Sequence, residues 1–329
     1  MRATSMLVLR ERDIVPLLPM RDAIHAVERA LRAQADGMAR MPLRVGVPAH
    51  AGILAAMPGS LIAGGGALGA KLVTVFEGNA ERQIPTHQGV VMLFDPGTGT
   101  PIALLDARYL TEVRTAAVSA VATRLLANPQ AHVAAILGTG VQARSHALAM
   151  REVMALDDLR IWGRSIERAE EAAAWAREQG LPARAVAEVD VAIRGAQVVN
   201  TVTSAKASIF DDAAVGPGAH VNAVGSSTPV AREVPGTLVG RARLFVDSRE
   251  GAMNESGDIL LAITDGALTA HPELTLLGDV LTQRAHGRRS PEEITLFDSL
   301  GIAIEDVACA ALVADRARDQ GVGTEIEFP

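Results

Sequence analysis

The chain has 329 residues, 49% of them hydrophobic, and its 31 Lys and Arg against 38 Asp and Glu give a formal net charge of −7. This length exceeds the size at which a single core usually keeps growing, so we expect about two domains. The acidic balance and the few aromatic residues (six Phe, two Trp and one Tyr) argue against a nucleic-acid surface. Neither a membrane-length apolar span nor a signal peptide is evident, so we expect a cytoplasmic protein.

The first part of the chain predicts helices and antiparallel strands. Between Met20 and Gly37, apolar residues recur at intervals of three and four residues. This spacing predicts a helix that ends at the glycine. The turn Asp95-Pro96-Gly97-Thr98-Gly99 predicts a hairpin. The run 109–127 reads as one helix, which ends at Asn128-Pro129 and forms the expected hinge element. The predicted strands are 52–57, 69–76, 90–95 and 101–105.

From residue 133 onward, apolar runs alternate with amphipathic runs. Such alternation of strand and helix patterns predicts a doubly wound parallel sheet. The predicted strands are 133–137, 159–162, 183–186, 198–202, 219–224 and 244–247, and helical runs are predicted at 166–179 and 189–196.

After residue 250 the pattern is helical, at 258–264, 276–284 and 302–318. The last helix follows a completed sheet and has no place in it, so we expect it to pack on the N-terminal domain. The predicted organisation is therefore a discontinuous mixed α+β domain, 1–120 plus 300–329, with an α/β Rossmann domain inserted at 121–299. The single cysteine, Cys309, lies in a buried-helix pattern, and we interpret it as a core residue rather than a nucleophile.

The most informative motif is the turn Gly138-Thr139-Gly140-Val141-Gln142-Ala143, between the apolar run 133–137 and a helical pattern. The first glycine permits the turn, the second admits a pyrophosphate, and the small third residue packs helix on strand. Free N–H groups of the helix then face the anion. An ordinary strand-to-helix turn is the alternative, but the context favours a dinucleotide site.

Two basic side chains occupy apolar surroundings. The strand period places Lys71 on the face of Val73 and Val75, where an ammonium must meet an anion or lose its proton. Leu110 and Val118 lie one helical turn before and after Arg114. Arg114 therefore either pairs with an acid such as Glu112 or binds a substrate carboxylate. Snorkelling at a sheet edge is the alternative for Lys71.

Arg44, in the run 41–45, is a third basic candidate, with a plain surface charge as the alternative. The eight histidines show no close metal-ligand spacing, so we propose no metal.

Six motifs occur in order along nearly the whole chain: Gly69-Ala70-Lys71, residues 85–95, residues 114–117, residues 138–143, residues 221–226 and residues 297–301. Together they make the chain resemble the ornithine cyclodeaminase/mu-crystallin family. This resemblance implies a homodimer with an N-terminal substrate-binding and dimerisation domain and an inserted Rossmann domain. It also implies that Arg44, Lys71 and Arg114 bind an amino-acid carboxylate beside the nicotinamide.

One position departs from the cyclodeaminase pattern. Those members carry an aspartate two residues before the proline of the segment Gly225-Ser226-Ser227-Thr228-Pro229, and this chain has Ser227 there. A serine hydroxyl is a poor base for cyclisation at neutral pH. Relatives with this segment resemble imine reductases, which need only a hydride for C=N and a proton donor for the nitrogen.

The end of the run 159–162 carries no acid for a ribose 2′-OH, which NAD-preferring enzymes usually place there. Arg164 and Ser165 are suited to a 2′-phosphate, so we expect a preference for NADP(H), with NAD(H) as the alternative. The complete predicted cofactor set is Gly138, Thr139, Gly140, Val141, Gln142, Ala143, Arg164, Ser165, Thr201, Thr203, Val224, Gly225, Ser226, Ser227 and Ser299.

The sequence therefore predicts an NAD(P)H-dependent reductase of small 2-imino acids, such as the cyclic ketimines 1-pyrroline-2-carboxylate and 1-piperideine-2-carboxylate. Its predicted catalytic set is Lys71, Arg114, Arg44, Thr86 and His87. Three alternatives remain open: an alanine-type dehydrogenase that builds its imine from a 2-oxo acid and ammonia, an ornithine cyclodeaminase, and a non-enzymatic mu-crystallin-like ligand-binding protein.

Overall fold

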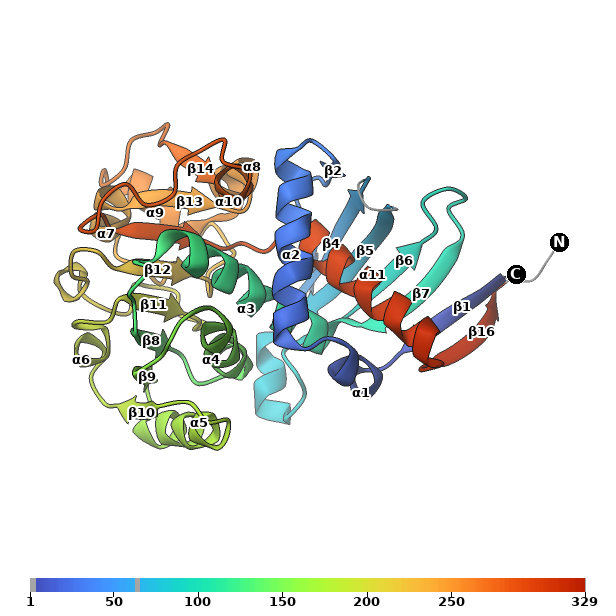
Figure 1. Cartoon of the computed structure of the whole chain (residues 1–329), viewed down its shortest axis with the longest axis horizontal. Helices are drawn as coiled ribbons and strands as arrows, with labels where there is room; N and C mark the ends of the chain where they lie inside the picture. Colours follow the sequence, from blue (N-terminus) through green and yellow to red (C-terminus); the bar gives the residue numbers. More distant parts are fainter. Residues whose placement is uncertain (1–3, 63–65, 329) are drawn as a thin grey trace. The chain divides into compact units, whose positions relative to one another are not determined.

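A computed structural model describes residues 4–62 and 66–328 of the chain. The fold comprises two compact units, coloured along the sequence in Figure 1. Unit 1 is Met1–Arg114 with Ile302–Pro329, and unit 2 is Thr115–Gly301. Among the described residues no helix is both long and apolar enough to cross a bilayer.

Unit 1 is built on an eight-stranded mixed sheet in the order β16-β1-β7-β6-β5-β4-β2, with β3 paired to β4. All pairs are antiparallel except β1 with β7. The strands are β1 (Thr4–Leu9), β2 (Ala39–Arg40), β3 (Val45–Ala49), β4 (Gly52–Leu61), β5 (Ala67–Val75), β6 (His87–Phe94), β7 (Pro101–Asp106) and β16 (Thr324–Phe328).

The last helix of the chain, α11 (Ala303–Gln320), lies against β4, β5, β6 and α2 (Met20–Ala35) within unit 1. Two glycines permit this close approach. A Cβ at Gly59 would lie 3.1 Å from the Cβ of Ala303, and a Cβ at Gly69 would lie 3.4 Å from Val307. Unit 1 also contains α1 (Glu11–Ile14), η1 (Val15–Leu17) and η2 (Glu77–Arg82). The boundary between the units falls inside α3 (Ala107–Leu126).

Unit 2 is a parallel sheet in the order β10-β9-β8-β11-β12-β15-β13-β14. The strand order reverses at β8, from which the chain first proceeds to β9 and β10 and then returns to β11 on the other side. Its strands are β8 (Val133–Leu137), β9 (Asp158–Trp162), β10 (Ala183–Val186), β11 (Val198–Thr201), β12 (His220–Ala223), β13 (Arg243–Val246), β14 (Leu274–Leu276) and β15 (Thr295–Asp298).

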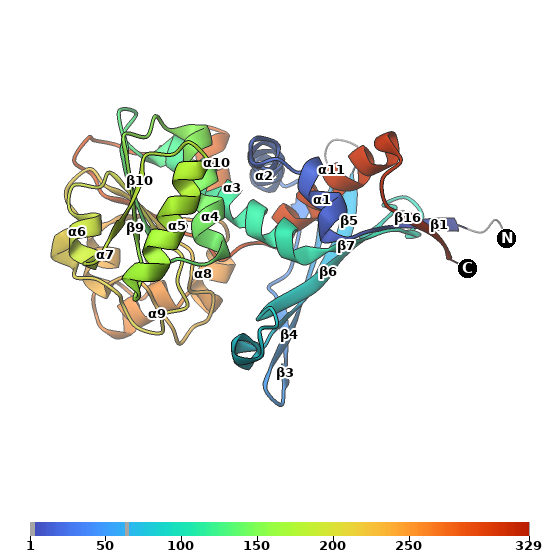
Figure 2. The ribbon, with the colours of Figure 1, turned by 90° about the horizontal axis from the view of Figure 1, so that it is seen from below.

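Helices cover both faces of this sheet, with α4 and α5 on one side and α6 and α7 on the other (Figure 2). This arrangement follows from right-handed crossovers, which change face when the strand order reverses. The predicted fold class is confirmed. The helical segments are α4 (Val141–Val153), α5 (Ile166–Glu178), α6 (Val189–Ile193), η3 (Asp212–Ala214), α7 (Gly236–Arg241), α8 (Arg249–Glu255), α9 (Gly257–Thr264) and α10 (Leu277–Leu281).

Several strands differ from the sequence prediction. β1, β3, β15 and β16 were not expected, and the predicted helix 276–284 begins one residue later, after the short strand β14, and ends at Leu281. β15 has only four residues, all buried, so no alternation of polar and apolar positions marks it as a strand. The prediction that Cys309 is a core residue is confirmed, since its side chain is fully buried.

Candidate functional site

The turn after β8 in unit 2 has the geometry of an anion-binding turn. Gly138 has φ of +139°, and a Cβ there would lie 2.7 Å from the carbonyl oxygen of Val202, so only glycine fits. A Cβ at Gly140 would meet no atom within 4 Å, and Gly140 caps α4 without a side-chain hydrogen bond. The N–H groups that open an α-helix lack helical partners, so this turn at the start of α4 suits a pyrophosphate.

The end of β9 packs directly on this turn. A Cβ at Gly163 would lie 2.5 Å from the Cγ2 atom of Thr139. The next residue, Arg164, is exposed. Ser165 caps α5 by accepting the N–H of Arg168 at 3.2 Å, and its hydroxyl donates to Glu167 at 2.7 Å. Arg164 and Ser165, which were predicted to bind a 2′-phosphate, therefore lie at the expected end of β9. The Ser165 hydroxyl, however, already donates a hydrogen bond to the carboxylate of Glu167.

A buried carboxylate joins the loops that follow β11 and β12. Glu233 accepts the backbone N–H of Thr203 at 2.6 Å and also its hydroxyl, and it accepts the N–H of Gly225 at 2.7 Å. Its side chain is fully buried. In turn, Asp258 accepts the backbone N–H groups of Glu233 and Val234, both at 2.9 Å. These acids were not among the predicted site residues.

The other predicted cofactor residues also lie at the carboxyl ends of the parallel strands. Thr201 ends β11 and is fully buried, and Val224 donates its N–H to the Thr201 carbonyl at 3.1 Å. Ser226 donates its hydroxyl to the Ala231 carbonyl. Ser299 follows β15, donates its N–H to Ala223 at 2.8 Å and is 3% exposed. Unit 2 therefore fits a dinucleotide laid across the carboxyl ends of its strands.

In unit 1, Lys71 on β5 is 2% exposed, and its Nζ lies 2.8 Å from Oδ2 of Asp306 on α11. Burial lowers the pKa of Lys71 to about 8, helped by the nearby charge of Arg114, while Asp306 opposes the shift. The predicted burial of this lysine is confirmed. Its anionic partner is a residue 235 positions further along the chain, which the sequence did not reveal.

Arg114 is held by the same carboxylate and its neighbour. Its Nε donates to Oδ1 of Asp306 at 2.9 Å, and its Nη1 donates to Oε2 of Glu305 at 3.1 Å. Burial opposes the charge, but the two carboxylates outweigh it and raise the pKa of Arg114 above its ordinary value. Burial likewise opposes ionisation of Asp306, but Arg114 and Lys71 prevail and lower the pKa of Asp306. Arg114 therefore pairs with these acids rather than with Glu112.

Arg44 and His87 lie on the same face of the sheet as Lys71. Val45 pairs with Ala56, so Arg44 falls opposite Met57, which pairs with Lys71. The charge of Arg44 contributes to lowering the Lys71 pKa. Burial, and then the charge of Lys71, lowers the pKa of His87, so this imidazole is neutral at pH 7.

The hydroxyl of Thr86 lies 3.1 Å from Nδ1 of His87. Unit 1 thus brings Arg44, Lys71, His87 and Arg114 to one face of its sheet, with Thr86 beside His87. A weak signal for the two missing acids was present in the sequence. Glu305 and Asp306 interrupt an otherwise apolar run of Ala, Ile and Val, and a pair of carboxylates in a buried helix needs cationic partners.

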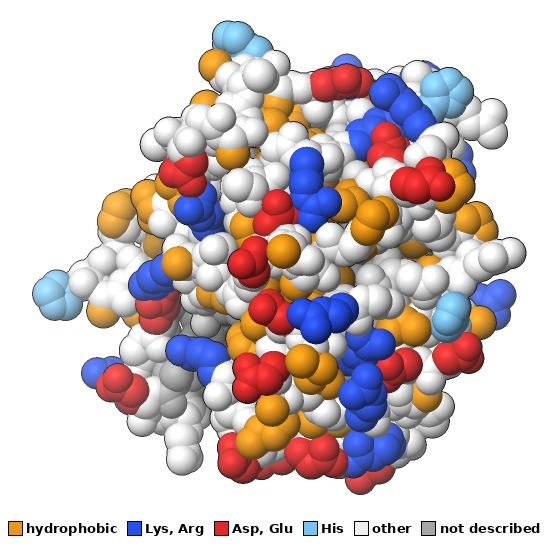
Figure 3. All heavy atoms as spheres, turned by 90° about the vertical axis from the view of Figure 1, so that its left-hand side faces the viewer, with side chains coloured by type: hydrophobic (Ala, Val, Ile, Leu, Met, Phe, Trp, Pro, Cys, Tyr) orange, Lys and Arg blue, Asp and Glu red, His pale blue; other side chains and the backbone are white. Residues whose placement is uncertain are grey.

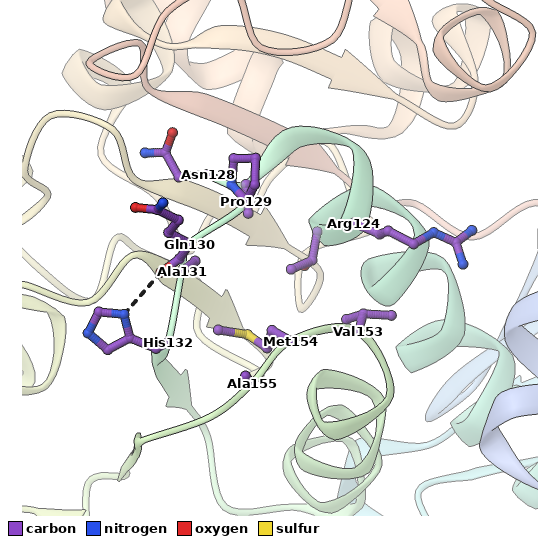
Figure 4. A pocket seen from close by; sticks show the side chains of 11 residues that line it. Arg124, Asn128, Pro129, Gln130, Ala131, His132, Val153, Met154 and Ala155 are labelled. Carbon is purple, nitrogen blue, oxygen red and sulfur yellow. Dashed lines mark hydrogen bonds between the residues drawn. The ribbon is translucent and has the colours of Figure 1, made fainter.

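A hollow of about 360 Å³ lies in unit 2 (Figure 4). It is lined by the end of α3, the segment before β8 and the connection from α4 to β9. That places it at the amino ends of the parallel strands, whereas the glycine-rich turn is at their carboxyl ends. On the face of the molecule in Figure 3, acidic and basic side chains are interspersed.

These features define an α/β protein with a glycine-rich turn of the dinucleotide-binding type and a second unit that holds two buried cations paired with two buried acids. The model of the ornithine cyclodeaminase/mu-crystallin family matches residues 4–321. The chain belongs to this family, and the predicted resemblance is confirmed.

Three known proteins illustrate the similarity. The ketimine reductase mu-crystallin of Mus musculus is 42% identical over 284 residues, covering 85% of this chain and 86% of that protein. The Thermococcus litoralis Delta(1)-pyrroline-2-carboxylate reductase in complex with NADH and L-proline has a TM-score of 0.94 and 33% identity, covering 98% and 100% of the two chains. An archaeal alanine dehydrogenase dimer with bound NAD has a TM-score of 0.94 and 32% identity, covering 99% and 100%.

The pKa of Lys71 can be measured directly, because the chain has only two lysines, Lys71 and Lys206. We expect ¹³C NMR of lysine-labelled protein to show one titration with a midpoint near 8. Since Asp306 favours the charged ammonium, Asp306→Asn should lower this midpoint further. Lys206→Arg assigns the two signals. A Lys71 midpoint that rises in the Asp306→Asn variant would contradict the ion pair.

Proposed function

We propose that the protein is an NAD(P)H-dependent reductase of small 2-imino acids, with cyclic ketimines such as 1-pyrroline-2-carboxylate or 1-piperideine-2-carboxylate as substrates and the L-amino acids as products. The observation that carries this proposal is the buried cluster of Lys71 and Arg114 in a chain that also has a dinucleotide-binding turn. The named activities of the relatives support it, as two of the three are reductases of imines.

The cations of the cluster suit a small carboxylate. Within the fold, Lys71 and Arg114 pair with the carboxylates of Glu305 and Asp306. Arg44 adds a further positive charge, which contributes to lowering the pKa of Lys71. The ammonium of Lys71 has three donors and uses one toward Asp306, so the others remain for the substrate.

The proposed reaction adds a hydride to the carbon of C=N and a proton to its nitrogen. When bound, the dinucleotide supplies the hydride. Arg114 and Arg44 bind the carboxylate and thereby orient the C=N bond. Lys71 binds the same carboxylate or supplies the proton, for which its lowered pKa is suited. Neutral His87 and Thr86 complete the polar lining, and Ser227 and Ser299 belong to the cofactor side.

Replacing Lys71 should remove turnover without unfolding the protein. We expect Lys71→Ala to lower kcat/KM by roughly 10³-fold, because an electrostatic contact to the substrate is lost. The assay measures cofactor oxidation with a panel of cyclic and linear imino acids, with cofactor binding and circular dichroism as checks on the fold. Arg32→Ala, on the surface of α2, is the matched control. Near-normal turnover of Lys71→Ala would refute the site assignment.

A second candidate is an alanine-type dehydrogenase, because the archaeal alanine dehydrogenase has the same fold and 32% identity. It would use the same cations for a 2-oxo acid and would form the imine from ammonia. The same assay separates the two functions. Oxidation of the reduced cofactor with pyruvate that depends on ammonia would favour the dehydrogenase.

We further propose that NADP(H) is the preferred cofactor. Arg164 is exposed at the end of β9, where the ribose of a dinucleotide is recognised, and a guanidinium there suits a 2′-phosphate. Glu167 opposes this preference, because its carboxylate lies 2.7 Å from the Ser165 hydroxyl and would repel the phosphate. Both NAD-containing relatives bind the cofactor without that phosphate.

Two substitutions test this preference. Arg164→Ala should weaken NADPH binding by about tenfold and change NADH binding little, because only the phosphate contact is lost. Glu167→Gln should strengthen NADPH binding, because a repulsive charge is removed. The dissociation constants of both cofactors are measured by fluorescence titration. Tighter binding of NADH than NADPH to the unaltered protein would overturn the proposed preference.

The protein is also proposed to form a homodimer through unit 1. Lys71 and Leu72 point to opposite faces of the sheet, and the Leu72 face is apolar and uncovered in the single chain. Paired residues share a face, so Val45, Ala56 and Leu72 form one row and Val47, Leu54 and Thr74 the next. Val45 and Val47 are 57% and 56% exposed, and Leu72 is 41% exposed. Such an apolar sheet face typically marks an interface.

A charge on this face should prevent association. We expect Leu72→Glu to convert the dimer to a monomer in light-scattering measurements, because two carboxylates would be buried in a symmetric interface. Val191→Glu, at an exposed valine of α6 in unit 2, is the control and should stay dimeric. A dimer that persists in Leu72→Glu would place the interface elsewhere.

A further inference from the structure

Glu233 is a buried anion whose partners are all dipoles. Two backbone N–H groups and one hydroxyl donate to its carboxylate. Among the described residues, no Lys, Arg or His side chain forms a hydrogen bond or ion pair with it. The adjacent Arg232 pairs with Asp265 instead. Three donors to one carboxylate favour its charged form, although burial raises its pKa.

The acids around Glu233 add negative charge or carry protons. Burial raises the pKa of Asp258 to about 7, with a contribution from Glu233. Burial also raises the pKa of Asp298, to which Asp258 and Asp247 contribute. The carboxylate of Glu233 accepts hydrogen bonds from three donor groups, and that of Asp258 accepts two. The buried carboxylate of Asp298 has few hydrogen-bond partners. Glu233 is therefore the member of this cluster best supplied with donors for a negative charge.

Glu233 lies at the strand ends toward which the nicotinamide half of a bound dinucleotide would extend. The pyrophosphate turn follows β8, and the adenosine ribose is recognised at the end of β9. The nicotinamide half must then extend the other way from β8, toward the ends of β11 and β12. Thr203 and Gly225 lie on the loops after these two strands, and Glu233 joins them. A Cβ at Gly225 would lie 2.1 Å from the Thr203 carbonyl oxygen, so the two loops are in direct contact.

We propose that Glu233 is the electrostatic partner of the nicotinamide ring, favouring the positively charged oxidised ring over the neutral reduced ring. A buried negative charge without a cation acts over a longer range than one at the surface, since little solvent screens it. The reduction potential of the bound cofactor is thereby lowered, which makes the reduced cofactor a stronger hydride donor. This inference rests on the proposed dinucleotide function but on no particular substrate.

The test compares the dissociation constants of oxidised and reduced cofactor in the absence of substrate. Glu233→Gln removes the negative charge, so binding of the oxidised cofactor should weaken by roughly tenfold relative to binding of the reduced cofactor. For a two-electron couple, tenfold corresponds to a rise of about 30 mV in the potential of the bound cofactor. A purely structural role would weaken both forms equally and leave the ratio unchanged, which would overturn the proposal.

Two variants serve as comparisons. Glu233→Asp keeps the carboxylate but shortens its reach, so both forms should bind more weakly with a ratio within about twofold of the unaltered protein. Asp265→Asn removes an exposed acid near the same segment and should leave the ratio unchanged. A ratio that shifts in Asp265→Asn as much as in Glu233→Gln would assign the effect to general surface charge and overturn the proposal.

If the Glu233→Gln variant does not fold, Thr203→Val provides an alternative test of the same proposal. It removes the hydroxyl donor, so the Glu233 carboxylate becomes easier to protonate. As the pH is lowered, the ratio of the two dissociation constants should then begin to change at a higher pH than in the unaltered protein. An unchanged pH dependence of this ratio would overturn the proposal. Failure of either cofactor to bind the unaltered protein would instead refute the proposed function, so the two failures are distinguishable.

Discussion

The site of unit 1 depends on one carboxylate that holds two cations. Asp306 binds Lys71 through one oxygen and Arg114 through the other, and all three side chains are buried. Buried ions require partners, and without this acid Lys71 would lose its carboxylate partner while Arg114 would keep only that of Glu305. Breaking such a pair typically destabilises a protein by about 3–5 kcal/mol. The same contact therefore fixes the helix α11 on the sheet and keeps two positive charges available for a substrate.

Unit 2 stabilises charge in a different way. Its carboxylate Glu233 accepts two backbone N–H groups and a hydroxyl rather than an opposite ion, and its glycine-rich turn suits an anion through backbone N–H groups. Backbone donors are rigid and do not change protonation state, so they suit a cofactor that alternates between charge states. In unit 1 the buried charges meet side-chain ions, whereas Glu233 in unit 2 meets mainly main-chain dipoles. The proposed reaction draws on both.

The sequence predicted the parts of the molecule that local chemistry determines. The turn 138–143 requires its glycines within six residues, and Lys71 stands out against an apolar strand. Partners that come from remote segments were missed. Asp306 meets Arg114 across 192 positions, and Glu233 meets Thr203 across 30, so neither pairing leaves a periodic signal. The short buried strand β15 was missed for a related reason, since only its neighbours in the sheet identify it as a strand.

The dependence on Asp306 has a consequence for how the chain acquires its structure. Unit 2 is continuous in sequence, whereas unit 1 needs α11, the last helix to be synthesised. On the ribosome, unit 2 has all of its strands before unit 1 has its final helix. Until then Lys71 and Arg114 lack their carboxylates, and the sheet of unit 1 lacks the helix that covers it. The chain can therefore complete the sheet of unit 2 before Lys71 and Arg114 of unit 1 meet their carboxylates.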